Sequence, residues 1–286
     1  MGSRISLLSK RSYLKKSVLY WLCLSPFVIT TLFPFAVMLS TAIKPRAEVL
    51  SFPPVWLPRH IRLQNFADMW QAVGFGRALV NSALVSCTTT ALCLLIAIPA
   101  AYATGRMQFR GRRLFRQFLL VTQMLSPVVL VLGIFRLMAT MGLVDQLWAL
   151  VLVYIAFNLA FAIWMLQAYF GTIPIELEEA ARLDGASTFQ RLRLILLPLT
   201  LPALGVTAIF VFLYCWNEFV LALTLLRSTE KFTLPLQIFS LVGGRYSVEW
   251  DHVMAATLLA SGPVAVVFAS LQRYLVRGLA IGVIKE

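Results

Sequence analysis

Long apolar stretches alternate with short polar segments along the whole chain. Six of these stretches approach or exceed the roughly 20 residues that a helix needs to cross a membrane. They predict spans over approximately 18–43, 78–104, 117–136, 147–170, 199–222 and 252–272, the fifth continuing toward Leu226. Strand-length alternating segments are absent, which disfavours a barrel. The pattern predicts an all-α membrane protein with six transmembrane helices.

The first apolar stretch predicts an uncleaved span rather than a signal peptide. It runs for 27 residues from Ser17 to Ile43, whereas the apolar region of a signal peptide has about 7–15. We expect residues 1–16 to form a short cytoplasmic segment and residues 17–286 to form one transmembrane domain.

Composition supports a membrane protein, because 60% of the residues are hydrophobic and only 13% are charged. In typical soluble proteins about 45–50% of the residues are hydrophobic and about 25% are charged. The net charge is +13, but the basic residues cluster between apolar stretches. This distribution is typical of topology determinants and contacts with membrane lipid, not of nucleic-acid binding. The four cysteines lie in apolar stretches, so we expect buried thiols and no disulfide framework.

The basic residues also predict an orientation. Of the 25 lysines and arginines, 16 lie on the side of the two termini and 9 on the other side. Since cytoplasmic loops carry the excess of such residues, both termini are predicted to be cytoplasmic. Two long outer loops follow, Lys44–Arg77 with an aromatic and proline-rich segment, and Arg227–Asp251 with Gly243, Gly244 and Tyr246.

The polar segment 174–198, between the fourth and fifth spans, is predicted to form two short helices separated by a bend. Acidic residues favour the positive end of the first helix dipole: Glu176, Glu178 and Glu179. Gly185 ends that helix, Ser187 and Gln190 form a capping box, and Pro198 marks the entry into the fifth span. Taken alone, this pattern also fits an amphipathic connector at the membrane interface that has no partner.

Seven residues of this loop fall at the spacing of the EAA signature of ABC importer permeases: Glu179, Ala180, Ala181, Gly185, Ile195, Leu197 and Pro198. Three other segments resemble the carbohydrate-uptake branch of that family: Trp216–Phe219, Leu271–Tyr274 and Val276–Leu279. Within this branch the chain is similar to the shorter, six-span subunits of the maltose-permease kind, over essentially its whole length. The resemblance implies a transport subunit of a bacterial inner membrane that is not itself an enzyme.

The same resemblance implies partners. The loop would dock into a cytoplasmic ATPase, with Glu179 reaching a basic group and with Ala180, Ala181 and Gly185 permitting close packing. A dimer of that ATPase would hold ATP and magnesium, so no cofactor is expected on this chain. A second permease subunit, in a heterodimer, would complete the path, and an extracytoplasmic solute-binding protein would deliver the solute. The tail Gly278–Glu286 would approach the ATPases.

Other chemistry finds no support in the residues. No G-x-x-x-x-G-K-[ST] phosphate loop occurs, which agrees with ATP binding elsewhere. His60 and His252 lie far apart in outer segments, with no carboxylate or cysteine at ligand spacing. We therefore predict neither a metal site nor a nucleophilic site.

Polar and aromatic residues within the spans are the candidates for a translocation path: Asn81, Asn158, Trp216, Asn217 and Glu218. Polar groups in spans are costly and more often face a cavity than lipid. The competing role is hydrogen bonding between helices, worth about 0.6 kcal/mol on average. Glu218 is the exception, because a carboxylate at that depth needs water, a partner or a raised pKa.

These features favour a permease for a sugar, an oligosaccharide or a polyol, since aromatic rings suit apolar sugar faces while amides and carboxylates suit hydroxyls. One alternative is an importer of another solute, such as glycerol phosphate or an amino acid. An anionic solute should leave an unpaired arginine or lysine in mid-span, and no span has one. A second alternative, an ion-coupled carrier, should show inverted repeats and several mid-span acids. A membrane enzyme is the third.

Overall fold

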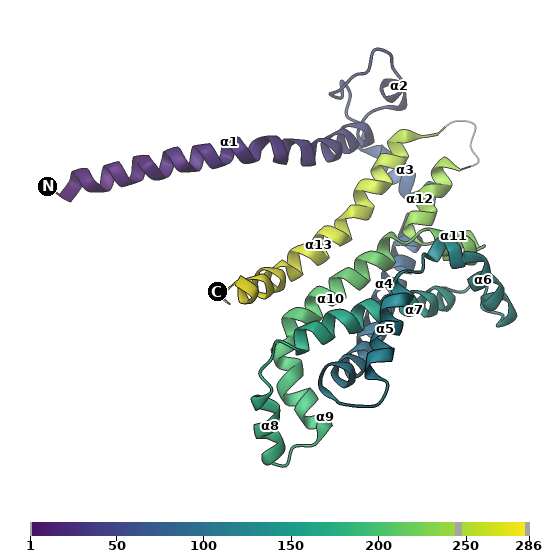
Figure 1. Ribbon diagram of the computed structural model, residues 1–286. Coiled ribbons are helices and arrows are strands. Elements are labelled where there is room, and N and C mark those ends of the chain that lie inside the picture. The colour runs from purple at the N-terminus through teal and green to yellow at the C-terminus, as the bar shows by residue number, and fades with distance from the viewer. Residues whose placement is uncertain (1, 244–247, 284–286) are drawn as a thin grey trace. The chain divides into compact units, whose positions relative to one another are not determined.

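The computed structural model describes residues 2–243 and 248–283, with the side chains of residues 20–243, 248–270 and 272. This part of the chain is helical and contains no strand, as predicted (Figure 1). Its helices are α1 (Gly2–Ala42), α2 (Arg46–Val49), α3 (Gln64–Ala72), α4 (Phe75–Arg106), α5 (Arg112–Gln123), α6 (Pro127–Thr140), α7 (Leu147–Phe170), α8 (Glu176–Leu183), α9 (Thr188–Gln190), α10 (Leu197–Asn217), α11 (Val220–Leu225), α12 (Leu234–Val242) and α13 (Trp250–Val283). A π-helical turn, Arg191–Leu196, joins α9 to α10, and a 3-10 turn, Thr229–Lys231, precedes α12.

Five helical segments are long and apolar enough to cross a membrane: Tyr20–Ala42, Phe75–Arg106, Leu147–Phe170, Thr188–Asn217 and Trp250–Ser270. The bent pair α5 and α6 supplies a sixth if it counts as one span. This agrees with the predicted all-α class. α1 starts at Gly2, so residues 2–16 of the predicted N-terminal segment belong to the same helix as the first span.

The third span is not the continuous helix predicted over 117–136. α5 and α6 meet at a bend of 99°. Pro127 disfavours helical geometry at the residue before it, and Ser126 is accordingly extended, with ψ of 134°. Proline at the first position of α6 then suits the start of a new helix. The apolar pattern continues across this break, which is why the pattern alone predicted one helix.

The fifth span differs from prediction at the end away from the loop. At its start α10 begins at Leu197 with Pro198 in its first turn, as predicted, and it continues the helical turns of the loop, so that Thr188–Asn217 forms one helical segment of 30 residues. Pro198 has no N–H to donate to the carbonyl four residues earlier, and the wider turn Arg191–Leu196 lies directly before it. At the other end α10 stops at Asn217, and Glu218 is extended with φ of −70° and ψ of 128°. The predicted continuation to Leu226 is a separate short helix, α11.

The chain divides into two compact units, of which the first comprises Met1–Met69 and Arg245–Leu259. In it the loop that begins at Lys44 folds back onto the end of α1. Nζ of Lys44 donates hydrogen bonds to the carbonyls of Val55 and Trp56, and Oγ of Ser40 donates to Trp56 over 2.6 Å. Three hydrogen bonds from two side chains, Ser40 and Lys44, thus hold the aromatic and proline-rich segment of this loop in place.

Both histidines lie in this first unit and each pairs with a glutamate. Nδ1 of His60 lies 2.8 Å from Glu48, and Nδ1 of His252 lies 2.9 Å from Glu249. The hydrogen bond from His60 lowers the pKa of Glu48. Among the described residues, no group of three or more His, Cys, Asp or Glu side chains is placed to hold a metal ion.

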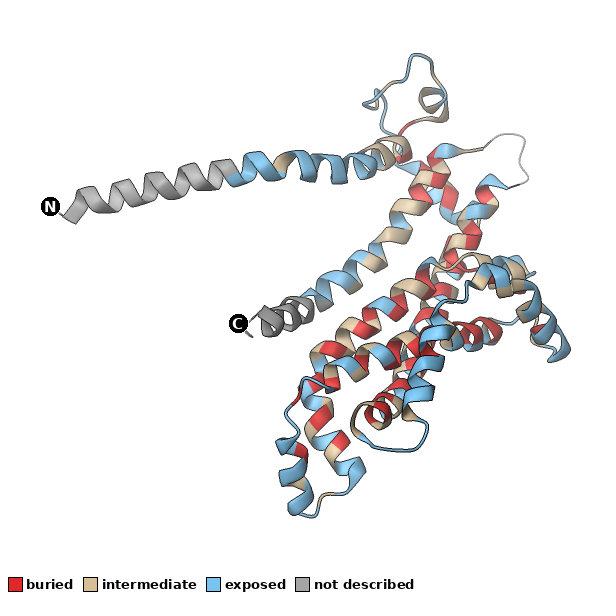
Figure 2. Ribbon diagram, viewed as in Figure 1, coloured by how far each residue is buried: buried red, intermediate tan, exposed pale blue. Residues whose placement is uncertain are grey.

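The second unit comprises Trp70–Gly244 and Ala260–Glu286, and its centre is formed by α4, α7 and α10. α4 packs along α7, and α10 packs against both. The contact faces carry alanines that are fully buried, among them Ala97, Ala101, Ala149 and Ala162. Small residues let helix backbones approach closely inside a membrane. The burial pattern in Figure 2 shows these inward faces in red against exposed outer faces.

Candidate functional site

The loop between the fourth and fifth spans forms the predicted helix–bend–helix. α8 ends at Leu183, and Gly185 takes a φ of +81°, the left-handed conformation that glycine adopts without strain. The capping box is present: Ser187 N donates to Gln190 Oε1 over 2.8 Å, and Gln190 N donates to Ser187 Oγ over 3.3 Å. The sequence therefore determines the shape of this loop locally, at one glycine and one pair of polar side chains.

The signature residues lie mainly on the open side of this loop. Glu179, Ala180 and Gly185 are exposed and Ala181 is half-buried, whereas Ile195 and Leu197 are partly buried and Pro198 is exposed. Three large apolar side chains beside them are also open, with Leu183 89%, Phe189 66% and Leu194 68% exposed. These three side chains are therefore free of packing contacts that would bury them within the isolated chain.

Glu178 differs from its acidic neighbours because its side chain points inward. It is 7% exposed, forms an ion pair of 3.1 Å with Nε of Arg106 and accepts a hydrogen bond of 3.1 Å from Tyr102 Oη. The same guanidinium donates to the backbone carbonyls of Phe170 and Ile173. This cluster therefore joins α8 to the ends of α4 and α7.

One helical segment runs from the loop to the opposite end of the fifth span. Thr188–Asn217 has 30 residues, which corresponds to about 45 Å at 1.5 Å per residue. Its first turn belongs to the bend of the loop, and its last turns carry Leu213, Tyr214 and Asn217, which line a cavity.

That cavity, of about 560 Å³, has one wall from α7 and one from α10. It is lined by Gln123, Phe157, Asn158, Phe161, Phe210, Leu213, Tyr214, Asn217 and Glu218. The lining includes four aromatic rings and two carboxamide side chains that were predicted as path residues, Asn158 and Asn217. The rings of Phe161 and Phe210 pack edge to face, with their centroids 5.8 Å apart. The structure thus brings together three of the five candidate path residues, Asn158, Asn217 and Glu218.

Glu218 has the protein partners that its depth requires. Oε2 accepts a hydrogen bond of 2.7 Å from Tyr154 Oη, and the backbone N–H groups of Leu221 and Ala222 donate to its two oxygens over 2.8 and 3.2 Å. The carboxylate therefore caps the first turn of α11 while bordering the cavity.

The other two candidates, Trp216 and Asn81, do not line this cavity. Trp216 is 4% exposed, stacks on Phe212 with ring centroids 5.4 Å apart and donates from Nε1 to the carbonyl of Ala260. Asn81 donates from its amide to the carbonyls of Glu230 and Phe232 over 2.9 and 3.1 Å. Both contacts join separate segments of the second unit, so these side chains hold the fold around the cavity.

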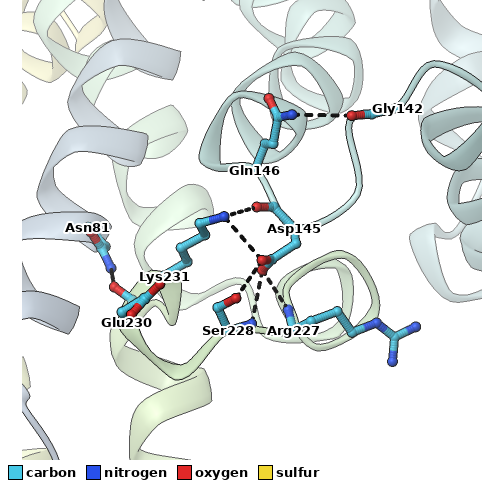
Figure 3. A network of polar contacts seen from close by, with 8 residues as sticks. All are labelled: Asn81, Gly142, Asp145, Gln146, Arg227, Ser228, Glu230 and Lys231. Carbon is cyan, nitrogen blue, oxygen red and sulfur yellow. Dashed lines mark hydrogen bonds and ion pairs between the residues drawn. The ribbon is translucent and has the colours of Figure 1, made fainter.

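Asp145, which sequence reasoning did not single out, is the centre of a polar network beside Asn81 (Figure 3). Its carboxylate accepts hydrogen bonds from Arg227 N at 2.9 Å, Ser228 N at 3.0 Å, Ser228 Oγ at 2.6 Å and Lys231 Nζ at 3.1 Å. These donors, the Ser228 hydroxyl foremost, hold the pKa of Asp145 well below its usual range. The network fastens the α6–α7 turn to the segment that follows α11.

Comparison with known proteins identifies the family. The profile of the family described as binding-protein-dependent transport system inner membrane component matches residues 94–281. The chain belongs to this family. The matched residues include the whole of the loop 174–198 and every residue that lines the cavity.

Individual relatives of this binding-protein-dependent permease match over nearly the whole chain. It is 35% identical over 259 residues to the diacetylchitobiose uptake system permease protein DasC of Streptomyces coelicolor, covering 90% of this chain and 93% of the relative. It is 33% identical to the trehalose/maltose transport system permease protein MalG of Thermococcus litoralis, covering 90% and 92%. A solved bacterial ABC transporter involved in the import of the acidic polysaccharide alginate contains a chain that is 26% identical, with a TM-score of 0.76 and coverage of 92% and 98%. The resemblance to carbohydrate ABC permeases is confirmed.

Sequence reasoning about this permease missed the Glu178 cluster and Asp145 for the same reason. In the sequence Glu178 is one of three acids in a helical turn, and Asp145 is an acid in a short turn. Only the paired partners distinguish them, and those partners lie 72 and more residues away for Glu178 and 82 or more for Asp145. The sequence offered one clue to the partner of Glu178. Arg106 is a basic residue at the end of the second predicted span, where it needs an acidic partner or water.

Proposed function

We propose that this permease forms, with a second permease subunit, the translocation path of an importer for a sugar, an oligosaccharide or a polyol. An extracytoplasmic solute-binding protein delivers the solute, and a separate pair of ATPase subunits binds ATP and magnesium and supplies the energy. The single observation that carries this proposal is the helical segment Thr188–Asn217, which connects the exposed signature loop to the wall of the cavity.

The lining of the cavity favours a neutral, hydroxyl-rich solute. Aromatic rings pack against the apolar faces of sugar rings, while Asn158, Asn217 and Gln123 present amide groups to hydroxyls. None of the described residues that line the cavity is a lysine or arginine, which an anionic solute such as glycerol phosphate requires. The similarity to permeases named for diacetylchitobiose and for trehalose and maltose agrees with this solute class.

The exposed signature face fits a docking role. Docking would bury Leu183, Phe189 and Leu194, which are open in the isolated chain, and place Glu179 beside a basic group of the ATPase. When the two ATPases close on ATP, the loops of the two permeases are drawn together and the helical segment carries this movement to the cavity. We further propose that both termini and this loop are cytoplasmic.

The test starts with purification of the tagged permease from mild detergent, together with its co-expressed neighbours. We expect an ATPase subunit and a second permease to co-purify. In liposomes that hold this complex, Glu179→Lys should uncouple ATP hydrolysis from sugar uptake, because it reverses the charge at the docking face.

The matched control is Glu230→Lys, which reverses an exposed acid far from the signature loop and should leave coupling unchanged. Normal coupled uptake in Glu179→Lys would remove the role assigned to Glu179. Recovery of the permease alone, folded and able to transport without ATP, would favour an ion-coupled carrier instead.

A further inference from the structure

Glu178 is the one buried acid in α8, whose other acidic residues are exposed. Glu176 and Glu179, on either side of Glu178, are exposed, whereas the Glu178 side chain is 7% exposed. A buried carboxylate is tolerated when it is paired and hydrogen-bonded. Both conditions are met, by the ion pair with Arg106 and by the Tyr102 hydroxyl. Glu178 is therefore turned away from the docking face and serves a contact inside the permease.

Arg106 makes this contact a junction of three helices. It is the last residue of α4, it pairs with Glu178 of α8, and it donates to the carbonyls of Phe170 and Ile173 at the end of α7. The planar guanidinium can bind a carboxylate and backbone carbonyls at once, which an ammonium group does less well. The Tyr102 ring adds an edge-on contact with Phe170, with centroids 6.5 Å apart.

The two walls of the cavity are thus tied to the signature loop by different links. The α10 wall, with Phe210, Leu213 and Tyr214, continues directly from the loop through Thr188–Asn217. The α7 wall, with Phe157 and Phe161, is separated from α8 by the non-helical residues 171–175. The guanidinium of Arg106 bridges this break, because it contacts both the carbonyl of Phe170 at the end of α7 and the carboxylate of Glu178 in α8.

We propose that Glu178 and Arg106 are positioning residues that pass movement of the signature loop to the α7 wall of the cavity, so that both walls move together. This inference rests on the proposed function of the loop. This role differs from docking to the ATPase, because the Glu178 side chain faces inward and contacts Arg106 of the same chain.

The test uses reporters that do not depend on the solute. In the co-purified complex, with the four native cysteines replaced by alanine, Phe161→Cys places a thiol on the α7 wall and Leu213→Cys places one on the α10 wall. The rate of labelling by a water-soluble maleimide is measured without nucleotide and with the ATPases locked by ATP and vanadate. Without further change, both reporters should show a several-fold change in rate.

In Glu178→Gln, the change at Phe161→Cys should be lost while the change at Leu213→Cys is retained. Arg106→Gln and the double variant should give the same loss and no greater one, since residues acting through one contact are non-additive. Glu176→Gln, which removes an exposed charge from the same turn, should leave both responses intact.

Each other outcome is decisive. Retention of both responses in Glu178→Gln overturns the inference, and so does loss of both, which would mean that the pair shapes the docking surface. If neither reporter responds in the complex before any change at Glu178, the proposed function of the loop fails, and the joint fails with it.

Discussion

At the scale of single residues, Asp145 adopts a left-handed backbone conformation that allows both its backbone and its carboxylate to form hydrogen bonds. Its φ of 61° is unusual for any residue but glycine, although asparagine and aspartate adopt it most readily. In this conformation its backbone N–H donates to Leu225 and its carboxylate receives four donors from the segment after α11. Asp145 thereby fixes the end of α11, while Glu218 fixes its beginning.

Asp145→Asn should therefore lower the stability of the purified permease. Asparagine keeps the shape and tolerates the left-handed conformation, so the change isolates the charge. We expect a loss of about 1 kcal/mol at pH 7, which is roughly 2–4 °C in Tm for a chain of this size. The measurement is thermal unfolding in detergent.

The pH dependence follows from the lowered pKa of Asp145. A carboxyl group whose pKa is depressed in the folded state stabilises above its unfolded pKa of about 3.9 and loses that effect as the pH falls further. The Tm difference between the two proteins should thus stay constant from pH 8 to about 5 and shrink below about 4. A difference that grows toward acid pH would contradict this assignment.

The residues of the site were predictable to different degrees. Glu218 was recognisable because a carboxylate in an apolar stretch must have a partner, but the partner, Tyr154, could not be named from spacing. The signature residues could be named because they are close together in sequence. Trp216 and Asn81 have the right chemistry for a path, yet their contacts with Ala260 and Glu230 turn them away from the cavity.

At the scale of elements, the apolar pattern predicted where helices cross the membrane but not where they break. Helices break at Pro127 and at Glu218, inside continuous apolar stretches. The pattern of apolar residues cannot predict such breaks, because it continues unchanged across them. The reverse holds in the signature loop, whose bend depends on local chemistry. There Gly185, Ser187 and Gln190 were sufficient to predict both helices.

Gly185→Ala tests whether that bend is needed in its present form. A Cβ at Gly185 would meet no atom within 4 Å, so the cost is conformational only. Because φ is +81°, we expect alanine to destabilise the bend by about 1–2 kcal/mol and asparagine to do so less. Hydrogen–deuterium exchange over α8 and α9 should be faster in Gly185→Ala.

The control for this change is Gly133→Ala, in the interior of α6, where a Cβ also meets no atom within 4 Å. Alanine is favoured over glycine in a helix by up to about 1 kcal/mol, so this variant should be neutral or slightly more stable. Equal exchange over α8 and α9 in Gly185→Ala and in the unchanged permease would show that the loop does not depend on the left-handed turn.

At the scale of the whole molecule, importing a solute requires the signature loop and the first outer loop to face opposite sides of the membrane. The excess of basic residues predicts that the loop 174–198 and both termini are cytoplasmic. Leu183→Cys in the signature loop and Arg59→Cys in the first outer loop introduce exposed thiols into a background without the native cysteines. In intact cells a membrane-impermeant maleimide should label Arg59→Cys only, and after permeabilisation it should label both. Labelling of Leu183→Cys in intact cells would invert the orientation and separate the loop from any cytoplasmic ATPase, so this experiment also tests whether the energy source can reach the helical segment that leads to the cavity.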